Sequence, residues 1–257
     1  MLPAERRNDI LKLVREQETV TVSALAVKYS VTEETIRRDL EKLEKAGSLM
    51  RTHGGAMLIK EDSPRTEQPA TIRRLTNVPQ KTAIASLVAE LIQDGDAVLL
   101  DDSSTSLFVA RALKPKKGLT VITNSLDVIL ELSDRTDWNV MSTGGVLRQR
   151  SNSFVGNHAE TTVSSFYADK AILSCKGIDL ERGFSESNEP CAMVKRKMLS
   201  SAREVILAID SSKFDLISFV RIGALDSLTT LVTDRRPDER WLEVLEENKI
   251  RCIWAEA

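Results

Sequence analysis

The sequence predicts an α/β protein in two parts: three short helices with a β-hairpin, then a larger domain around a mostly parallel sheet. Residues 1–57 show helical periodicity broken by turn residues. From residue 80 onward, apolar helical stripes alternate with short continuous apolar runs, which are typical of buried parallel strands. The polar stretch between them contains three prolines. We therefore expect a domain at residues 1–57, a linker at 58–79 and a second domain at 80–257.

The first part contains apolar positions at the spacing of three short amphipathic helices. They are Ile10, Leu11 and Val14 in the first helix (about residues 4–17), Leu25, Ala26 and Tyr29 in the second, and Ile36, Leu40 and Leu43 in the third. Thr21 and Thr32 are expected to cap the second and third helices, and Gly47 to end the third. Strands at 49–51 and 56–59, around a turn at Gly54-Gly55, complete a winged helix-turn-helix.

In a winged helix-turn-helix the third helix enters the major groove of DNA. Arg37 and Arg38 lie off the apolar stripe of this helix, so their guanidinium groups can face phosphates and base edges. The alternative is a solvated charged face with i,i+4 pairs such as Arg37 with Glu41. The acidic pair Glu33-Glu34 would repel phosphate, so these carboxylates are expected to point away from the DNA backbone, or one to accept from a cytosine amine. The expected DNA-binding residues are Thr21, Thr32, Glu34, Thr35, Arg37, Arg38, Arg51 and His53.

These residues resemble the N-terminal domain of the DeoR family of bacterial transcriptional regulators. The resemblance rests on Leu25-Ala26, Tyr29, Val31, Thr35-Ile36-Arg37-Arg38-Asp39-Leu40, Leu43, Gly47, Arg51 and His53-Gly54-Gly55-Ala56. Thr32 stands where the family usually has serine, and either residue caps a helix.

Composition limits the class of protein. A net charge of −2, with ten basic and nine acidic residues in 1–56, excludes a coating protein with general nucleic-acid affinity. Cys175, Cys191 and Cys252 lack metal-ligand spacing, and with only His53 and His158 a histidine metal cluster is excluded. No apolar run approaches the roughly 18 residues that span a membrane. We expect a cytoplasmic protein with no metal and no cofactor.

Strands and helices alternate in the second part, after a helical stripe at residues 83–91. Expected strands are 97–100, 120–123, 139–142, 170–174, 204–209, 229–233 and 250–254, and expected helices are 105–113, 125–133, 156–166, 189–202 and 237–247. Polar residues follow the first three strands: Asp101 with Ser103, Ser104 and Thr105, then Thr123, Asn124 and Ser125, then Gly144 and Gly145. Ligands of open α/β sheets bind at this carboxyl edge, and helix N-termini hold anions. The alternative for each loop is ordinary N-capping.

The second part also resembles the DeoR-family effector domain. The matching residues are Lys81, Ile84-Ala85, Gly95-Asp96, Asp101, Ser104-Thr105, Thr123-Asn124-Ser125, Gly144-Gly145, Gly156, Asp169, Gly177-Ile178-Asp179, Gly183, Glu189, Lys195-Arg196, Asp210-Ser211-Ser212-Lys213 and Thr233-Asp234. The resemblance implies a fold similar to ribose-5-phosphate isomerase and the sensing of phosphorylated sugars. Ser103 replaces the family's usual glycine, which narrows the approach of a phosphate or adds a hydroxyl donor.

Five further residues complete the expected effector site: Lys176, Gly177, Glu189, Lys195 and Lys213. Alternatives remain for some of them. Lys213 would otherwise pair with Asp210 or Asp215, and Glu189 would otherwise cap its helix. Arg148 and Arg150 would close over an anion or lie in a solvated loop, and the solvated loop is the expectation.

Two functions are compared. The first is a regulator, most often a repressor in this family, that binds operator DNA as a homodimer or homotetramer and responds to a sugar phosphate. The second is an isomerase-like sugar-phosphate enzyme fused to a DNA-binding module. An isomerase needs a base and an acid at one carbon, and the sequence shows no such convergence. The regulator is therefore preferred and no enzymatic activity is expected.

Overall fold

The computed structural model describes residues 2–17, 19–45, 49–52, 54–57 and 66–255. Contacts divide the chain into two compact units. The N-terminal unit comprises Met1–Asp62 with Thr71–Val78, and the C-terminal unit comprises Ser63–Ala70 with Pro79–Ala257. Part of the stretch expected to be a linker is therefore grouped with the C-terminal unit.

The N-terminal unit contains the three predicted helices. They are α1 (Pro3–Gln17), α2 (Val22–Tyr29) and α3 (Glu33–Lys45). The Thr21 hydroxyl accepts from the backbone of Ala24 at 3.2 Å, and the Thr32 hydroxyl accepts from Thr35 at 3.3 Å, as expected of N-caps. The predicted apolar stripe of α3 is buried against the other helices.

The hairpin of this unit belongs to a three-stranded antiparallel sheet in the order β1-β3-β2, with β1 (Thr19–Thr21), β2 (Met50–Thr52) and β3 (Gly55–Met57). Strand β1 was not predicted, since its last residue, Thr21, was expected only to cap α2. Gly47, Leu58 and Ile59, which carried part of the prediction, lie outside the described residues.

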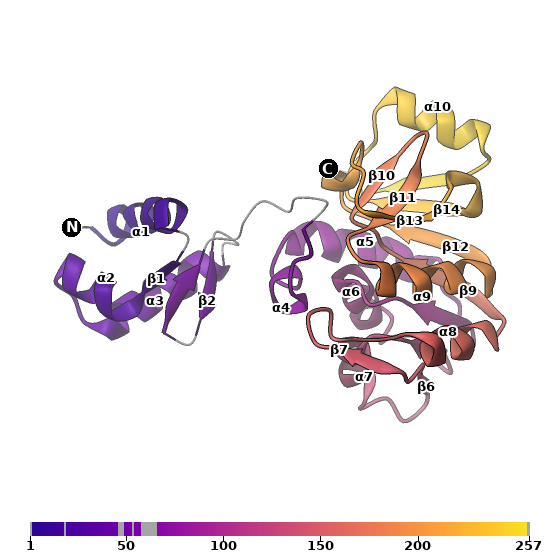
Figure 1. The fold of residues 1–257 in the computed structure, drawn as a ribbon, viewed down its shortest axis with the longest axis horizontal. Helices are drawn as coiled ribbons and strands as arrows, with labels where there is room; N and C mark the ends of the chain where they lie inside the picture. Colours follow the sequence, from indigo (N-terminus) through magenta and orange to yellow (C-terminus); the bar gives the residue numbers. More distant parts are fainter. Residues whose placement is uncertain (1, 18, 46–48, 53, 58–65, 256–257) are drawn as a thin grey trace. The chain divides into compact units, whose positions relative to one another are not determined.

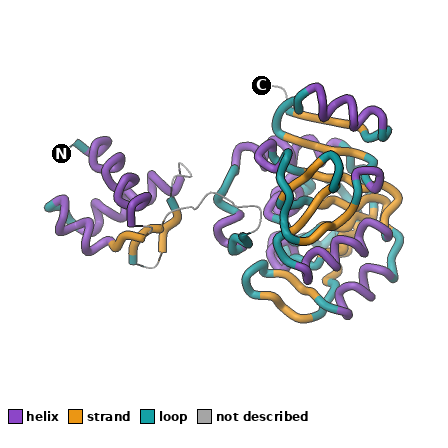
Figure 2. Tube along the Cα trace, turned by 45° about the horizontal axis from the view of Figure 1, so that its top comes forward, coloured by secondary structure: helices purple, strands orange, loops and turns teal. Residues whose placement is uncertain are grey.

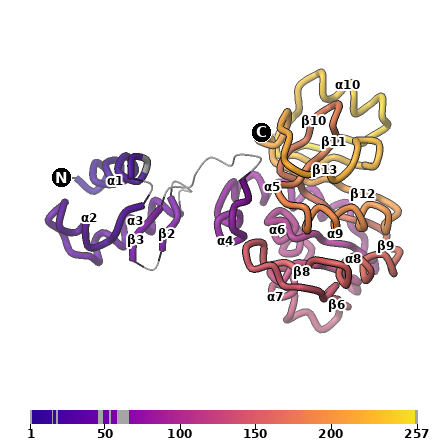
Figure 3. The backbone as a smooth tube through the Cα atoms, viewed as in Figure 1, coloured from indigo at the N-terminus to yellow at the C-terminus, as the bar shows by residue number. Residues whose placement is uncertain are grey.

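The C-terminal unit is built on a seven-stranded sheet in the order β15-β14-β12-β9-β4-β5-β6. Every neighbouring pair is parallel. The strands are β4 (Ala97–Leu100), β5 (Thr120–Thr123), β6 (Asn139–Ser142), β9 (Ala168–Leu173), β12 (Ala202–Ala208), β14 (Thr230–Thr233) and β15 (Arg251–Trp254). All seven predicted strands are present: β4, β5 and β6 have the predicted bounds, and the other four differ from the prediction by one or two residues at an end. Figure 3 follows the chain through them.

Helices cover both faces of this sheet (Figure 2). Buried residues of α8 (Asn157–Ser164), α9 (Glu189–Ser200) and α10 (Glu239–Glu247) pack on one face, and those of α5 (Val78–Glu90), α6 (Ser104–Ala112) and α7 (Leu126–Leu132) on the other. Neighbouring strand residues alternate between the two cores: Leu99 faces one and Leu100 the other. A further short helix, α4 (Ala70–Arg73), precedes α5 in the chain.

Two small antiparallel sheets were not predicted. One pairs β7 (Val146–Arg148) with β8 (Ser153–Val155), and the other has the order β10-β11-β13, with β10 (Gly177–Asp179), β11 (Gly183–Glu186) and β13 (Val220–Gly223). Short 3-10 turns η1 (Ser211–Lys213) and η2 (Leu225–Ser227) follow β12 and β13. The small strands are only three or four residues long, and their sequences resemble loops.

Candidate functional site

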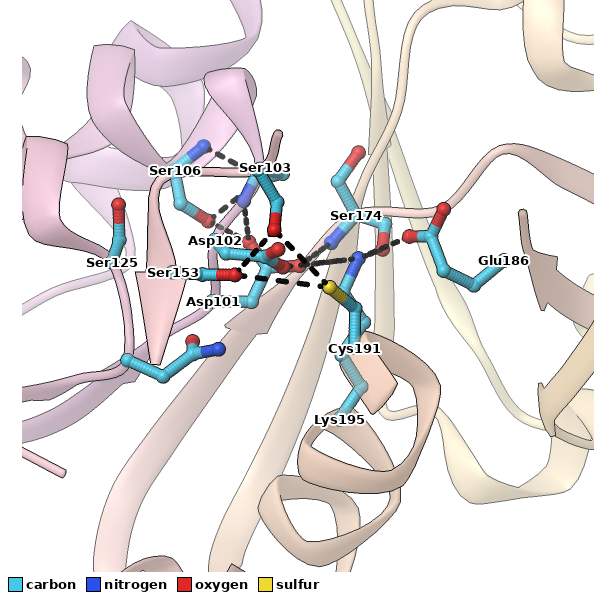
Figure 4. Close-up of polar contacts among 12 residues, drawn as sticks. Asp101, Asp102, Ser103, Ser106, Ser125, Ser153, Ser174, Glu186, Cys191 and Lys195 are labelled. Atoms are coloured by element: carbon cyan, nitrogen blue, oxygen red, sulfur yellow. Dashed lines mark hydrogen bonds and ion pairs between the residues drawn. The ribbon is translucent and has the colours of Figure 1, made fainter. Parts of the chain in front are cut away.

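A buried ammonium group lies at the carboxyl edge of the parallel sheet. Lys195 of α9 places its Nζ 2.6 Å from a Glu186 carboxylate oxygen and 3.1 Å from Asp101 (Figure 4). Asp102 is 3.8 Å away, and the lysine also donates to the carbonyl of Ser174 at 2.9 Å. The lysine side chain is only 2% exposed. The predicted residues Asp101 and Lys195 are thus in direct contact, although they are far apart in the sequence.

The cluster formed by Lys195, Asp101, Asp102 and Glu186 has more negative than positive groups. Burial disfavours the charged form of Lys195, but attraction to Asp101, Glu186 and Asp102 outweighs it and raises the pKa of the ammonium well above its usual range. Burial likewise opposes ionisation of Glu186, yet Lys195 lowers its pKa to about 2. The lysine is therefore charged, and a phosphate placed beside the three carboxylates would be repelled.

Asp101 organises the loop after β4. One carboxylate oxygen accepts from the backbone of Ser103 at 2.9 Å and from the Ser106 hydroxyl at 2.6 Å, and the other accepts from the backbone of Ser174 at 2.8 Å. Ser103 itself is the N-cap of α6, and its hydroxyl both accepts from the Ser106 backbone and donates to the Ser106 hydroxyl. Its φ of −75° is open to any residue, so the backbone does not require the family's glycine here.

The loop after β5 contains an unsatisfied acceptor. The Asn124 side chain donates to the carbonyl of Phe154 at 3.2 Å, but its buried Oδ1 has no hydrogen-bond partner among the described residues. Thr123 and Ser125 are engaged locally: Thr123 Oγ1 donates to the carbonyl of Leu100, and Ser125 Oγ caps α7. Because a buried acceptor without a partner costs free energy, Asn124 is suited to receive a donor from a ligand.

Two of the predicted glycines are required by sterics. A Cβ at Gly145, where φ is +109°, would lie 2.7 Å from the carbonyl oxygen of Val155. A Cβ at Gly177 would lie 2.3 Å from the carbonyl oxygen of Leu216. Gly144 has open space around it but also a positive φ of +62°. These residues shape the backbone at the sheet edge rather than offering side-chain chemistry.

Other predicted residues lie around this edge, and one of them, Lys176, helps to lower the pKa of Glu186. Ser104 and Thr105 form the first turn of α6, Lys176 is buried just before β10, and Lys213 is half-buried in η1. Glu189 is exposed, and the capping role considered for it was wrong, because Asn188 caps α9. Asp215 accepts from Arg240 and Trp241.

Four members of the site were missed from the sequence: Asp102, Ser174, Glu186 and Cys191. Glu186 lies in β11, a strand that the sequence did not reveal. Cys191 lies in α9, with its sulfur 3.7 Å from the Ser151 hydroxyl and 3.8 Å from that of Ser153. No residue pattern links these positions, since the contacts join separate parts of the chain. Of these four residues, only Asp102 could have been predicted from the sequence, because it follows a strand directly after Asp101.

Arg148 lies at the end of strand β7 and is half-buried, which corrects the prediction of a solvated loop for this residue, whereas Arg150 lies in an exposed turn as predicted. Both bind Glu67: Arg148 uses two guanidinium nitrogens on the Glu67 carboxylate, and Arg150 donates twice to the Glu67 backbone carbonyl. Asn188 donates to the same carboxylate at 3.3 Å. The attraction between guanidinium and carboxylate overrides the polar, turn-like sequence around the two arginines.

On α3 of the N-terminal unit the predicted arginines face outward. The Arg37 side chain is 50% exposed and that of Arg38 is 74% exposed. They pair with Glu33 at 2.8 Å and Glu34 at 3.3 Å, one turn earlier, rather than Arg37 with Glu41 as the alternative had it. Glu41 binds Lys45 instead. In the wing, a guanidinium nitrogen of Arg51 lies 3.9 Å from a carboxylate oxygen of Glu44. The hydroxyl groups of Thr32 and Thr35 are hydrogen-bonded to each other. His53 lies outside the described residues.

Family models match both units. The DeoR-like helix-turn-helix domain matches residues 6–62, and the DeoR C terminal sensor domain matches residues 76–235. Within the part of the chain that the structure describes, no helix is long and apolar enough to span a bilayer. In the same residues, no group of three or more His, Cys, Asp or Glu side chains is arranged to hold a metal ion.

The chain is similar to several transcriptional regulators, and the similarity extends over nearly the whole length of both chains. The chain is 42% identical to the HTH-type transcriptional regulator YulB of Bacillus subtilis, over 98% of this chain and 96% of that protein. It is 32% identical to the glycerol-3-phosphate regulon repressor of Escherichia coli K12, covering 98% of each. It is also 32% identical to the HTH-type transcriptional repressor GlcR of Bacillus subtilis, covering 100% and 98%.

Among solved structures, ribose 5-phosphate isomerase A of Methanocaldococcus jannaschii is matched at a TM-score of 0.38 and 14% identity, over 52% of this chain and 53% of that one. A likeness this distant carries no argument about activity. The two matched domains and the full-length relatives identify a DNA-binding transcriptional regulator with a small-molecule sensor domain, not an enzyme, and the chain belongs to the DeoR family.

Proposed function

We propose that this regulator represses a sugar-catabolism operon and is controlled by a phosphorylated sugar bound at the carboxyl edge of the parallel sheet. Residues 1–57 are assigned to DNA binding and residues 80–257 to effector binding and assembly. The name of the Escherichia coli relative, a glycerol-3-phosphate regulon repressor, supports a phosphorylated effector. The observation that carries the proposal is the buried Asn124 Oδ1 without a described partner at this edge.

The site has the chemistry for a polyol. Carboxylates accept hydrogen bonds from sugar hydroxyls, and Asn124 Oδ1 has the same capacity. The backbone N–H groups of the first turn of α6, at Ser104 and Thr105, are suited to donate to a sugar hydroxyl oxygen. We therefore orient the sugar hydroxyls toward Asp102, Glu186 and Asn124, with the phosphate directed away from the carboxylates. The remaining assigned effector residues frame this edge: Asp101, Ser103, Thr123, Ser125, Gly144, Gly145, Lys176, Gly177, Glu189, Lys195 and Lys213.

For DNA recognition we assign Thr21, Thr32, Glu34, Thr35, Arg37, Arg38, Arg51 and His53. The N-terminal part of a recognition helix meets base edges, while hydroxyls and basic groups around it meet phosphates. A homodimer or homotetramer would present two such helices to operator half-sites. The effector would then change the spacing or orientation of the pair, and the coupling is reciprocal between effector and DNA.

The test is a fluorescence-anisotropy titration of the protein onto DNA upstream of its own operon, with and without a panel of sugar phosphates. One sugar phosphate should weaken a tight, salt-dependent complex. Asn124→Leu should lose that response while keeping DNA binding, whereas Asn157→Leu, at an exposed position of α8, should respond as the wild type does. A complex indifferent to every compound in the panel would contradict a sugar-phosphate effector.

A further inference from the structure

The Glu67 carboxylate is held by converging arginine and asparagine donors, in the way that a protein holds an anionic ligand. Arg148 meets its carboxylate with two nitrogens, one of them at 2.6 Å, and Asn188 adds a donor at 3.3 Å. Arg150 lies 3.6 Å from the same carboxylate and donates to the Glu67 carbonyl. The Glu67 side chain is only 12% exposed. This two-pronged geometry is the one by which arginine recognises carboxylates and phosphates alike.

Arg148, Arg150 and Asn188, with the Glu67 that they hold, form a clamp that adjoins the candidate effector site. Asn188, which donates to Glu67, also caps α9, the helix that carries Cys191 and Lys195. The Arg148 guanidinium donates to Ser151, which contacts Cys191. Hydrogen bonding and attraction to Glu67 raise the pKa of Arg148, and Asp102 contributes to the same shift. The arginines are therefore the cationic end of a site whose other end, at Lys195, carries an excess of carboxylates.

We propose that Arg148, Arg150 and Asn188 form the subsite for the phosphate of the effector, and that the Glu67 carboxylate is an internal competitor which must leave when the phosphate binds. This inference rests on the proposed effector function and names the regulation of that site. A phosphate and the Glu67 carboxylate cannot occupy the same guanidinium face together. Repulsion by Asp101 and Glu186, at the Lys195 end, directs the phosphate to this end of the site.

Displacement of Glu67 would release a defined piece of chain. Residues 66–70 are held to the C-terminal unit by the Glu67 contacts and by the backbone of Ala70, which donates to the carbonyl of Arg150 at 2.9 Å. The same stretch follows the wing strand β3 along the chain. Effector binding would therefore change how the DNA-binding unit is tethered. A ligand that binds only when the clamp is open has an apparent dissociation constant equal to its intrinsic one divided by the fraction of protein in the open state.

The experiment measures inorganic phosphate binding to the full-length protein by calorimetry, in the wild type and in three variants. Glu67→Gln removes the competing charge and should bind phosphate roughly tenfold more tightly if the clamp is open about a tenth of the time. Arg148→Gln should bind it more weakly than the wild type. Glu247→Gln, at an exposed position of α10, is the matched control and should be unchanged. Glu67→Asp, which keeps the charge but shortens its reach, serves if Glu67→Gln does not fold.

A second measurement follows residues 66–70 themselves. Hydrogen exchange of a peptide covering residues 66–70 should speed up when phosphate is added to the wild type, because the Ala70 amide loses its partner. Equal phosphate affinity in wild type and Glu67→Gln, or unchanged exchange on phosphate binding, would overturn the competitor role. That result would leave the sugar-phosphate response of the operator complex intact. Conversely, tighter phosphate binding by Glu67→Gln with no operator response to any sugar phosphate would support the subsite and contradict the proposed function.

Discussion

Lys195 of α9 and Glu186 of β11 are bound to each other inside the protein, with 2.6 Å between Nζ and a carboxylate oxygen. Both side chains are less than a tenth exposed. Asp101 and Asp102 lie close to the same ammonium group. The edge of the sheet that carries the candidate effector site is therefore also a point on which the stability of the C-terminal unit depends.

We expect Lys195→Met to lower the free energy of unfolding by about 3–5 kcal/mol, the range for breaking a buried ion pair by removing one partner. The loss arises because three buried carboxylates would remain without their cation. Urea denaturation followed by tryptophan fluorescence measures it. Lys117→Met, at an exposed position, is the control and should change stability little. Equal stability of the two variants would contradict the role given to Lys195.

The stability of this unit should fall in acid through Glu186. Its folded pKa of about 2 lies below the usual 4.5, so its contribution is present above pH 4.5 and is lost as the pH falls from 4.5 toward 2. Glu186→Gln should flatten this dependence, because the amide does not titrate. Thermal unfolding from neutral pH down to about pH 3 tests this. Glu247→Gln should keep the wild-type slope, and a wild-type slope in Glu186→Gln would show that other groups cause the acid sensitivity.

In the N-terminal unit, Asp39 of α3 holds α1 through Arg6, with 2.6 Å between Oδ2 and Nε and both side chains buried. Arg7 adds a longer contact at 3.4 Å. Asp39→Asn should destabilise this unit by about 3–5 kcal/mol, because a buried guanidinium loses its counter-charge. Chemical denaturation monitored by circular dichroism provides the measurement. Glu41→Gln, which removes an exposed pair with Lys45 on the same helix, is the comparison and should leave stability nearly unchanged.

The exposed arginines of α3 allow a prediction of how operator affinity changes when their positive charges are removed. Arg38→Ala should weaken operator binding by about 1–3 kcal/mol with loss of sequence preference if Arg38 reads a base. If it contacts only phosphate, affinity should fall for all sequences and the salt slope should shrink by about one. Anisotropy titrations at several salt concentrations separate the two. Unchanged binding in both Arg37→Ala and Arg38→Ala would refute α3 as the recognition helix.

Glu34 allows a separate prediction, because it neutralises Arg38 in the protein without DNA. Glu34→Gln should raise affinity for random DNA, since a negative charge near the phosphates is removed and Arg38 is freed. Affinity for the operator should rise by the same factor unless Glu34 accepts from a cytosine amine. In that case the preference for the operator over random DNA should fall. Titrations on operator and scrambled duplexes distinguish these results.

Much of the fold was accessible from the sequence because local patterns specify it. The stripe of Ile36, Leu40 and Leu43, and the apolar run at residues 97–100, each fix an element by their own periodicity. The caps at Thr21, Thr32 and Ser125 are local as well, since each bonds to a backbone N–H three residues away. Strand β13 was missed because its partner β11 is distant in the chain, and the hairpin of β10 with β11 was missed because strands of three and four residues show little local pattern.

For the site, the positions of Asp101 and Asn124 after strands indicated the edge of the sheet, and Lys195 was expected there from the resemblance to the DeoR family. It could not show that Glu186 and Asp102 share the ammonium group of Lys195, or that the Asn124 acceptor is buried without a described partner. These facts depend on which loops meet in three dimensions. The roles proposed for the DNA-binding and effector residues remain predictions for the experiments above.

The sequence by itself determined the two-part organisation, the helix-turn-helix and the mostly parallel character of the larger sheet, because short-range periodicity and capping carry that information. Only the tertiary structure decided where charge is compensated. It turned Arg148 and Arg150 from expected loop residues into a clamp on Glu67, and it paired Arg37 and Arg38 with the carboxylates one turn before them. The physical reason is that an ion pair depends on distance in space and on exclusion of water, and neither quantity is written in the spacing of residues along the chain.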